Sequence, residues 1–198
     1  MMNKSSFFAK EVEYIKNPSI RRDTITLIDM LPDYFFTCAA SSTGKYHPKF
    51  SLGEGGLLRH TKAAVQIMID LYQNEIFCHG LSNDEKDLLI MALILHDGLK
   101  HGIDNERYVR FDHPVIMADF IEKNKSMLSL SEKYLKIVTD SIRCHMGPWI
   151  TNPYSEVILP IPKTKYEKMV HLCDYLSSRK GLNFEFDEDN NITNTDNY

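Results

Sequence analysis

LLIMALILHDGLK, residues 88–100, carries the strongest structural signal in this sequence. Its first eight residues are apolar without interruption, and Ser82 and Glu85 just upstream have the spacing of a helix-starting capping box. A helix that is apolar on every side belongs in a protein interior. The sequence therefore predicts a buried helix, surrounded by the other elements, that ends at the pair His96-Asp97.

Several other segments carry helical signals, either apolar residues at three- and four-residue spacing or residues typical of helix ends. Ser129 and Glu132 have the spacing of a second capping box, Pro32 interrupts the first segment, and Gly181 stops the last. The expected helices cover residues 20–36, a segment from 57, a segment opening at Pro114, about 129–145 and about 165–180. This pattern predicts an all-α fold.

Composition sets limits on the class of protein. The chain has 198 residues, of which 43% are hydrophobic and 25% charged, with a net charge of −4. We expect a single helical domain over residues 1–182 and an acidic, Asn-rich tail over 183–198, either disordered or holding a short hairpin. The longest apolar run is too short to span a membrane, and no signal peptide is apparent, which favours a soluble, cytoplasmic protein. The negative charge argues against extensive binding to duplex nucleic acid.

The pair His96-Asp97 is costly to bury unless a partner satisfies both side chains. A metal ion is such a partner, because neutral imidazole and carboxylate are both metal ligands. An ordinary capped helix end remains the alternative for one such pair. Other helical segments supply further candidates, namely His60, His113, His145 and Asp174. Convergence of histidines and carboxylates inside a helical bundle is a common way to build a metal site.

Three segments together resemble the HD superfamily of metal-dependent phosphohydrolases. GGLLRHT (55–61) is similar to the first-histidine element, especially that of the small 3′→5′ exoribonuclease and phosphodiesterase branch, and LILHDGLK (93–100) resembles the HD-x-G-K signature with Gly and Leu exchanged. CDYLSSRKG (173–181) is similar to the ending that carries the last aspartate. The resemblance covers about residues 45–181. It implies an all-α HD-domain bundle whose metal ligands are His60, His96, Asp97 and Asp174.

The same resemblance suggests a second ion. Branches with two metals use two further histidines, the first followed by proline, and His113-Pro114 and His145 match those places. Asp97 would then bridge the two ions. A helix cap for His113 and a dipole-stabilised helix end for His145 are the alternatives. The cofactor is therefore expected to be one or two divalent ions, with Mn²⁺, Fe²⁺, Co²⁺, Ni²⁺, Zn²⁺ and Mg²⁺ all candidates.

The resemblance also points to residues that meet the substrate. Asp97 and Lys100 are the predicted catalytic residues, since Lys100 occupies the lysine position of the family and could neutralise a phosphate oxygen. A solvated lysine at a helix end is the alternative for Lys100. Lys45, His47 and Lys49 lie in a basic loop that could contact phosphates, or could simply be solvated. Trp149 could stack on a base at the pocket rim, or could close the bundle as an aromatic lid without a ligand.

These features favour a metal-dependent hydrolase of phosphoester bonds in a nucleotide or short oligonucleotide. A phosphodiesterase ranks first because the His113 and His145 matches imply two metals. A one-metal nucleotidase or dNTP phosphohydrolase, and a nucleotide-sensing domain without activity, are the alternatives. The sequence does not determine the substrate, the metal, the oligomeric state or the pathway.

Overall fold

The computed structural model describes residues 3–45 and 47–194, and within these ranges it consists of helices, short 3-10 turns and connecting loops. Isolated β-bridges, and no strands, occur in this part of the chain. The all-α prediction is confirmed. The α-helices are α1 (Ala9–Glu13), α2 (Pro18–Met30), α3 (Gly56–Tyr72), α4 (Glu75–Cys78), α5 (Asn83–Leu95), α6 (His113–Lys123), α7 (Glu132–Arg143) and α8 (Lys165–Ser177).

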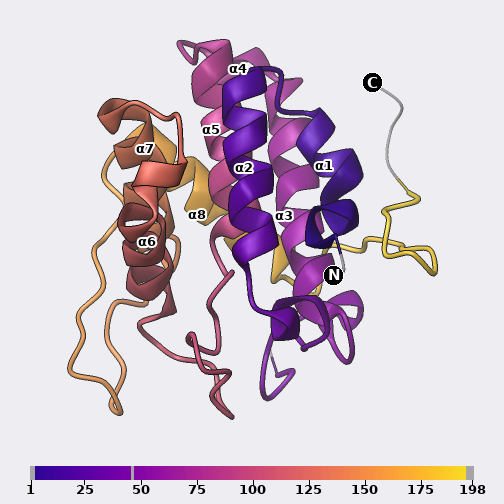
Figure 1. The fold of residues 1–198 in the computed structure, drawn as a ribbon. Coiled ribbons are helices and arrows are strands. Elements are labelled where there is room, and N and C mark those ends of the chain that lie inside the picture. Colours follow the sequence, from indigo (N-terminus) through magenta and orange to yellow (C-terminus); the bar gives the residue numbers. More distant parts are fainter. Residues whose placement is uncertain (1–2, 46, 195–198) are drawn as a thin grey trace.

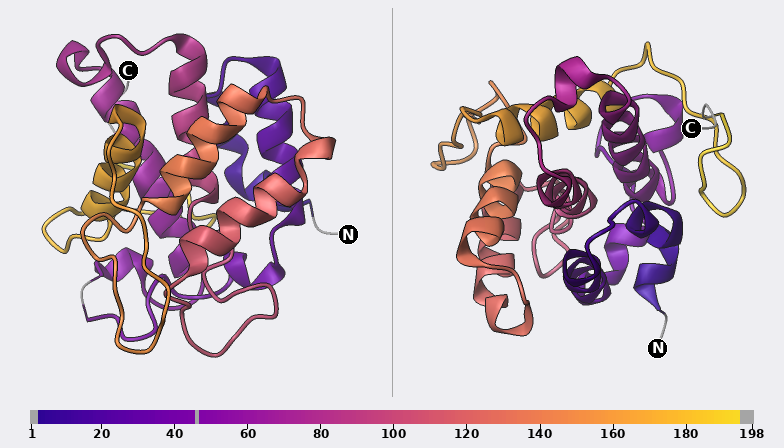
Figure 2. Two further views of the ribbon diagram at one scale, coloured as in Figure 1. Left: turned by 90° about the vertical axis from the view of Figure 1, so that its left-hand side faces the viewer. Right: turned by 90° about the horizontal axis from the view of Figure 1, so that it is seen from above.

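Helix α5 is the centre of the bundle, as its apolar sequence predicts. The capping box between Ser82 and Glu85 starts it, and every residue from 88 to 95 is buried. It contacts α2, α3, α7 and α8, and α6 packs on the outer side of the bundle against α7. Figure 1 shows α5 behind α2, and the view from above in Figure 2 shows α5 in the middle of the other helices. The residues at the C-terminal end of α5 therefore lie between several helices.

Several helix boundaries differ from the sequence-based expectation, and two of these differences have a clear cause. The first expected helix ends at Met30, before Pro32, and continues only as a 3-10 turn over Asp33–Phe36. The second capping box is wrong: the N-cap of α7 is Ser131, whose side chain accepts from the backbone of Tyr134. Ser129 instead donates from its backbone N–H and its hydroxyl to the buried carboxylate of Asp23 on α2. A contact across the fold overrides the local spacing.

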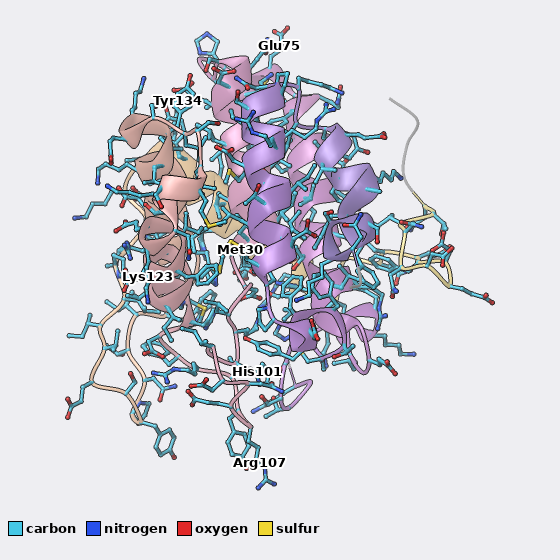
Figure 3. All side chains as sticks on the ribbon, in the orientation of Figure 1. Met30, Glu75, His101, Arg107, Lys123 and Tyr134 are labelled. Carbon is cyan, nitrogen blue, oxygen red and sulfur yellow. The ribbon has the colours of Figure 1, made fainter. Side chains whose placement is uncertain are left out.

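The long connections gather at one end of the bundle. The segments after the 3-10 turn at Asp33–Phe36, after α5 and after α7 all lie below the helices in Figure 1. Figure 3 shows His101 and Arg107 in the second of these segments, at the opposite end of the molecule from Glu75. The Tyr34 hydroxyl donates to the carbonyl of Gly102 at 2.7 Å and so fixes this segment to the bundle. Loops from distant parts of the sequence thus surround the end of α5.

The tail folds back onto α3. Arg59 and Lys62 donate to the side chains of Asn190 and Asn191, at 2.6 and 3.2 Å, and an antiparallel bridge joins Phe186 to Ile192. Residues 195–198, for which we expected disorder, lie outside the described residues. In the described part of the chain, no helix is long and apolar enough to cross a membrane.

Candidate metal centre

Four predicted ligands meet where α3, α5 and α8 converge. His60 lies on α3, His96 is the C-cap of α5, Asp97 follows it, and Asp174 lies on α8. Each offers one ligand atom, and these atoms all lie within 4.8 Å of one another. His60 Nε2 is 3.0 Å from Asp174 Oδ1, and His96 Nε2 is 3.5 Å from the same oxygen. The sequence predicted this first group, and the fold assembles it.

A second group lies beside the first and shares Asp97 with it. His113 is the first residue of α6, and His145 lies two residues beyond the last residue of α7. Their ligand atoms and that of Asp97 also lie within 4.8 Å of one another, and all three residues are buried. Both outer helices thus present a histidine to the residue that follows the central helix.

The carboxylate of Asp97 is divided between the two groups. Its Oδ2 is 3.6 Å from His60 Nε2 and 3.4 Å from His96 Nε2. Its Oδ1 is 3.0 Å from His113 Nε2 and 3.6 Å from His145 Nε2. This geometry suits a carboxylate that bridges two ions.

Hydrogen bonds on the far side of each ring determine which nitrogen faces the centre. The Nδ1 atoms of His96, His113 and His145 donate to carbonyls three residues earlier, at 2.6, 2.5 and 2.8 Å. For His60, Nδ1 donates to the hydroxyl of Ser177 at 3.1 Å, since that hydroxyl gives its own hydrogen to a backbone carbonyl. Every ring therefore carries its fixed proton on Nδ1 and directs Nε2 inward, as metal-binding histidines do.

The inward atoms need a cation. The Nε2 atoms of His113 and His145 are 3.1 Å apart, so two lone pairs face each other unless a proton or a metal ion lies between them. His96 Nε2 and Asp97 Oδ1 are buried and have no hydrogen-bond partner among the described residues. Buried polar atoms without a partner cost free energy. This donor set, imidazole nitrogens with carboxylates, fits a divalent metal.

A comparison with protein families agrees with this geometry. The model of the family described as HD domain matches residues 57–179, from the start of α3 to just beyond α8. The chain belongs to the HD-domain family. No curated protein and no solved structure matches the chain. Family membership places this HD-domain protein in a superfamily of metal-dependent hydrolases, generally phosphohydrolases.

The electrostatics of the HD-domain site favour a positive charge at its centre. Burial opposes ionisation of Asp97, but Lys100 and His96 outweigh it and hold the pKa of Asp97 well below its usual range. Burial also opposes a charge on His96, yet Asp97 and Asp174 raise the pKa of His96 to about 10. Burial lowers the pKa values of His60 and His145, which favours neutral rings. Two carboxylates beside two neutral imidazoles, with a positive charge already held on His96, make a site suited to a divalent ion.

Two further predicted residues stand at the edge of the site. Lys100 donates from Nζ to Asp97 Oδ2, and only 9% of the residue is exposed. The ring of His47 lies with its centroid 5.7 Å from that of His60. Burial lowers the pKa of His47 to about 4, so the ring is neutral at neutral pH. Lys100 thus brings a buried ammonium to the carboxylate of Asp97, and His47 brings a neutral imidazole to the edge of the site.

A cavity of about 700 Å³ opens onto the HD-domain site. Asp97, His113, His145 and Asp174 line it from the metal centre, and the predicted substrate residues His47, Lys100 and Trp149 line it too. Its other lining residues are Ala40, Ser41, Ser42, Thr43, Val109, Met146, Tyr175, Ser178 and Arg179. Lys45 and Lys49 are not among the lining residues, and their contact with substrate stays a prediction.

Sequence reasoning missed some residues that shape the site. Ser177 fixes the ring of His60, and its place three residues after Asp174, on the same helix face, was the available signal. Tyr175 and Arg179 line the cavity, and both stood in the quoted segment CDYLSSRKG. Ser41, Ser42 and Thr43 bring hydroxyl groups from a loop whose sequence shows no sign of its position.

Proposed function

We propose that this protein hydrolyses phosphoester bonds in a nucleotide or short oligonucleotide, with phosphodiesters preferred. The observation that carries the proposal is the single carboxylate of Asp97, whose two oxygens face two separate groups of ligands. A pair of ions a few ångströms apart suits in-line displacement at phosphorus, which is why the two-group geometry favours a diester substrate.

When bound, divalent ions in such a site activate water and offset the charge of phosphoryl oxygens. The side chains divide the remaining tasks. Lys100 holds an ammonium in the cavity beside Asp97, where it would neutralise charge on a phosphoryl or leaving-group oxygen. His47 is neutral and would exchange hydrogen bonds with the substrate without adding charge. The histidine rings are fixed through Nδ1, so they need no rearrangement to act as ligands.

The cavity bears on the size of the substrate. A volume of about 700 Å³ lies in the usual range of roughly 300–1,000 Å³ for small-molecule sites. It suits a mononucleotide or a short oligonucleotide end and not a duplex. The net charge of −4 agrees, since a protein that grips long nucleic acid relies on many cationic contacts.

One observation supports the alternative of a one-metal nucleotidase or dNTP phosphohydrolase. The second group has three protein ligands, whereas the first has four and includes two carboxylates. The second ion would therefore bind more weakly, and an enzyme that works with the first alone would act on monoesters or triphosphates. A domain that senses a nucleotide without cleaving it is the third candidate.

The decisive experiment combines metal analysis with a substrate screen. The purified chain, supplied with Mn²⁺, would be offered a linear dinucleotide, a cyclic dinucleotide, nucleoside monophosphates and dNTPs. We expect two ions per chain and faster cleavage of diesters. His145→Ala should reduce the metal content towards one ion per chain and abolish diesterase activity. His79→Ala removes an exposed histidine on a distant turn and should change neither the metal content nor the activity.

Saturation of the wild type at one ion, together with cleavage of monophosphates or dNTPs alone, would favour the nucleotidase. The hydrolase proposal would be refuted, in favour of the sensor, by tight nucleotide binding with an occupied metal site and no cleavage with any divalent ion.

A further inference from the structure

Part of the cavity wall is made of planar side chains. The ring of Trp149 stacks on that of Tyr175, with centroids 5.8 Å apart and 17° between the planes. The guanidinium of Arg179 lies over the same tyrosine, with Cζ 4.4 Å from the ring centroid. All three residues line the cavity. We call Trp149, Tyr175 and Arg179 the aromatic platform.

The platform is built on the same elements as the metal centre. Tyr175 directly follows the predicted ligand Asp174 on α8, and Trp149 follows His145 by four residues. His171 links the two elements, because its Nδ1 donates to the carbonyl of His145 at 2.7 Å. The platform therefore has a fixed position relative to the ligands.

Close packing holds the connection between these elements. Gly147 has a φ of +64°, and a Cβ there would lie 2.1 Å from Cε1 of His171. Only glycine lets the chain pass this close to α8 in that conformation. The His171 ring also lies edge-on to Trp149, with centroids 6.1 Å apart. The indole is thus held in place while Trp149 stays 50% exposed.

Arg179 is available to a ligand. Its Nε and Nη2 donate to the hydroxyl of Ser178 at 3.3 and 2.8 Å, and no described carboxylate forms an ion pair with it. The other cation of the cavity, Lys100, is paired with Asp97. A guanidinium stacks well on aromatic faces and attracts electron-rich rings. The platform consequently combines an exposed indole, a tyrosine and an unpaired planar cation.

We infer that the aromatic platform is a subsite for the base of a nucleotide substrate, with the base stacked on the exposed indole of Trp149, which Tyr175 supports, while its phosphate reaches the metal centre. The inference rests on the proposed function for the role of the phosphate, and it adds which residues select a base-bearing ester. Aromatic stacking suits any base, because every base has a π-face. The subsite therefore distinguishes nucleotides from aliphatic phosphoesters and does not read base identity.

The chain carries its own reporter for this subsite, since Trp149 is its single tryptophan. The full-length protein would be titrated with AMP and with ribose 5-phosphate, which differs in lacking the base. Indole emission would be excited at the red edge of its absorption, where AMP absorbs little, and affinities checked by calorimetry. We expect AMP to quench the emission and to bind roughly 5- to 150-fold more tightly than ribose 5-phosphate, the range that stacking of one base corresponds to.

Three variants test the individual groups. Tyr175→Leu keeps the reporter and should lose most of the preference for AMP. Arg179→Lys keeps the charge without the planar group. It should lower the affinity for AMP and leave the affinity for ribose 5-phosphate unchanged. Trp149→Phe retains a smaller ring. Its preference for AMP over ribose 5-phosphate, measured by calorimetry, should lie between that of the wild type and that of Tyr175→Leu. Tyr154→Leu is the matched control, because Tyr154 is 97% exposed and does not line the cavity.

Equal affinity for AMP and ribose 5-phosphate, or an unchanged preference in Tyr175→Leu, would overturn the inference even if phosphoesters are hydrolysed. Conversely, quenching by AMP and a preference that Tyr175→Leu abolishes would support the platform even if no phosphoester is cleaved with any divalent ion. In that event the hydrolase proposal alone would fail.

Discussion

Replacing Asp97 by asparagine tests the centre of the site with almost no change in shape. Asp97 is buried, and its two oxygens face the two ligand groups separately. The variant leaves the second group with two imidazoles and no carboxylate, and removes one of the two carboxylates from the first. Lys100 also loses the carboxylate to which it donates. We therefore expect the second ion to be lost and the first to bind weakly.

The loss should be large because the metal ions supply several kcal/mol of transition-state stabilisation. A loss of about 4 kcal/mol corresponds to about 1,000-fold in kcat/KM, and we expect at least that. The assay is dinucleotide hydrolysis with excess Mn²⁺, with bound metal measured by mass spectrometry and helical content by circular dichroism. Asp104→Asn, an exposed aspartate in the same segment, is the control and should behave as wild type. Near-normal activity of a folded, metal-replete Asp97→Asn protein would refute the assignment.

Three further outcomes are expected. Ser177→Ala removes the acceptor of His60 Nδ1 and should lower metal affinity by about 10- to 100-fold with little change in fold, as measured by titration against a metal chelator. Lys100→Met should reduce kcat about 100-fold while bound metal falls much less, because lysine is not a ligand here; equal loss of both would assign it a structural role. Since Asp97 and Asp174 raise the pKa of His96 to about 10, that ring is protonated at neutral pH and an ion must displace its proton. Metal affinity should therefore rise with pH up to about 10, with roughly one proton released per first ion in calorimetry across buffers of different ionisation enthalpy, and a pH-independent affinity would contradict this.

The central helix was predictable from sequence because its signal is strong and local. Residues 88–95 have no polar face, so no arrangement other than burial satisfies them, and the capping box at Ser82 marks the start. Ser129 shows the limit of the same reasoning. Its spacing to Glu132 is that of a capping box, but Asp23, more than 100 residues away, takes its hydrogen bonds and leaves Ser131 to cap α7. A local preference for a helix cap is overridden wherever a buried residue of another element forms a more favourable hydrogen bond with the same side chain.

The candidate site was likewise predictable only in part. The six predicted ligands lie on helices or at helix ends, so the order of motifs along the chain was enough to expect them together. The cavity wall depends on how α8 and the segments around residues 41–43 and 145–149 pack against one another. The loop carrying Lys45, His47 and Lys49 illustrates this, since only His47 lines the cavity. Charge and residue type could not reveal which of these neighbours faces inward.

The placement of the histidines at helix ends has a chemical reason. In the interior of a helix the backbone carbonyls are already bonded to N–H groups, whereas near its end they need other partners. His96 and His145 stand at such ends and donate from Nδ1 to the carbonyls of Leu93 and Ile142, three residues earlier. His113, at the start of α6, makes the same bond to the carbonyl of a preceding loop residue. One local bond thus satisfies the backbone and turns Nε2 towards the shared carboxylate. It follows that moving any of these histidines by one residue along the chain would turn its Nε2 away from the shared carboxylate, even if the helix itself were unchanged, because neighbouring helical residues point about 100° apart.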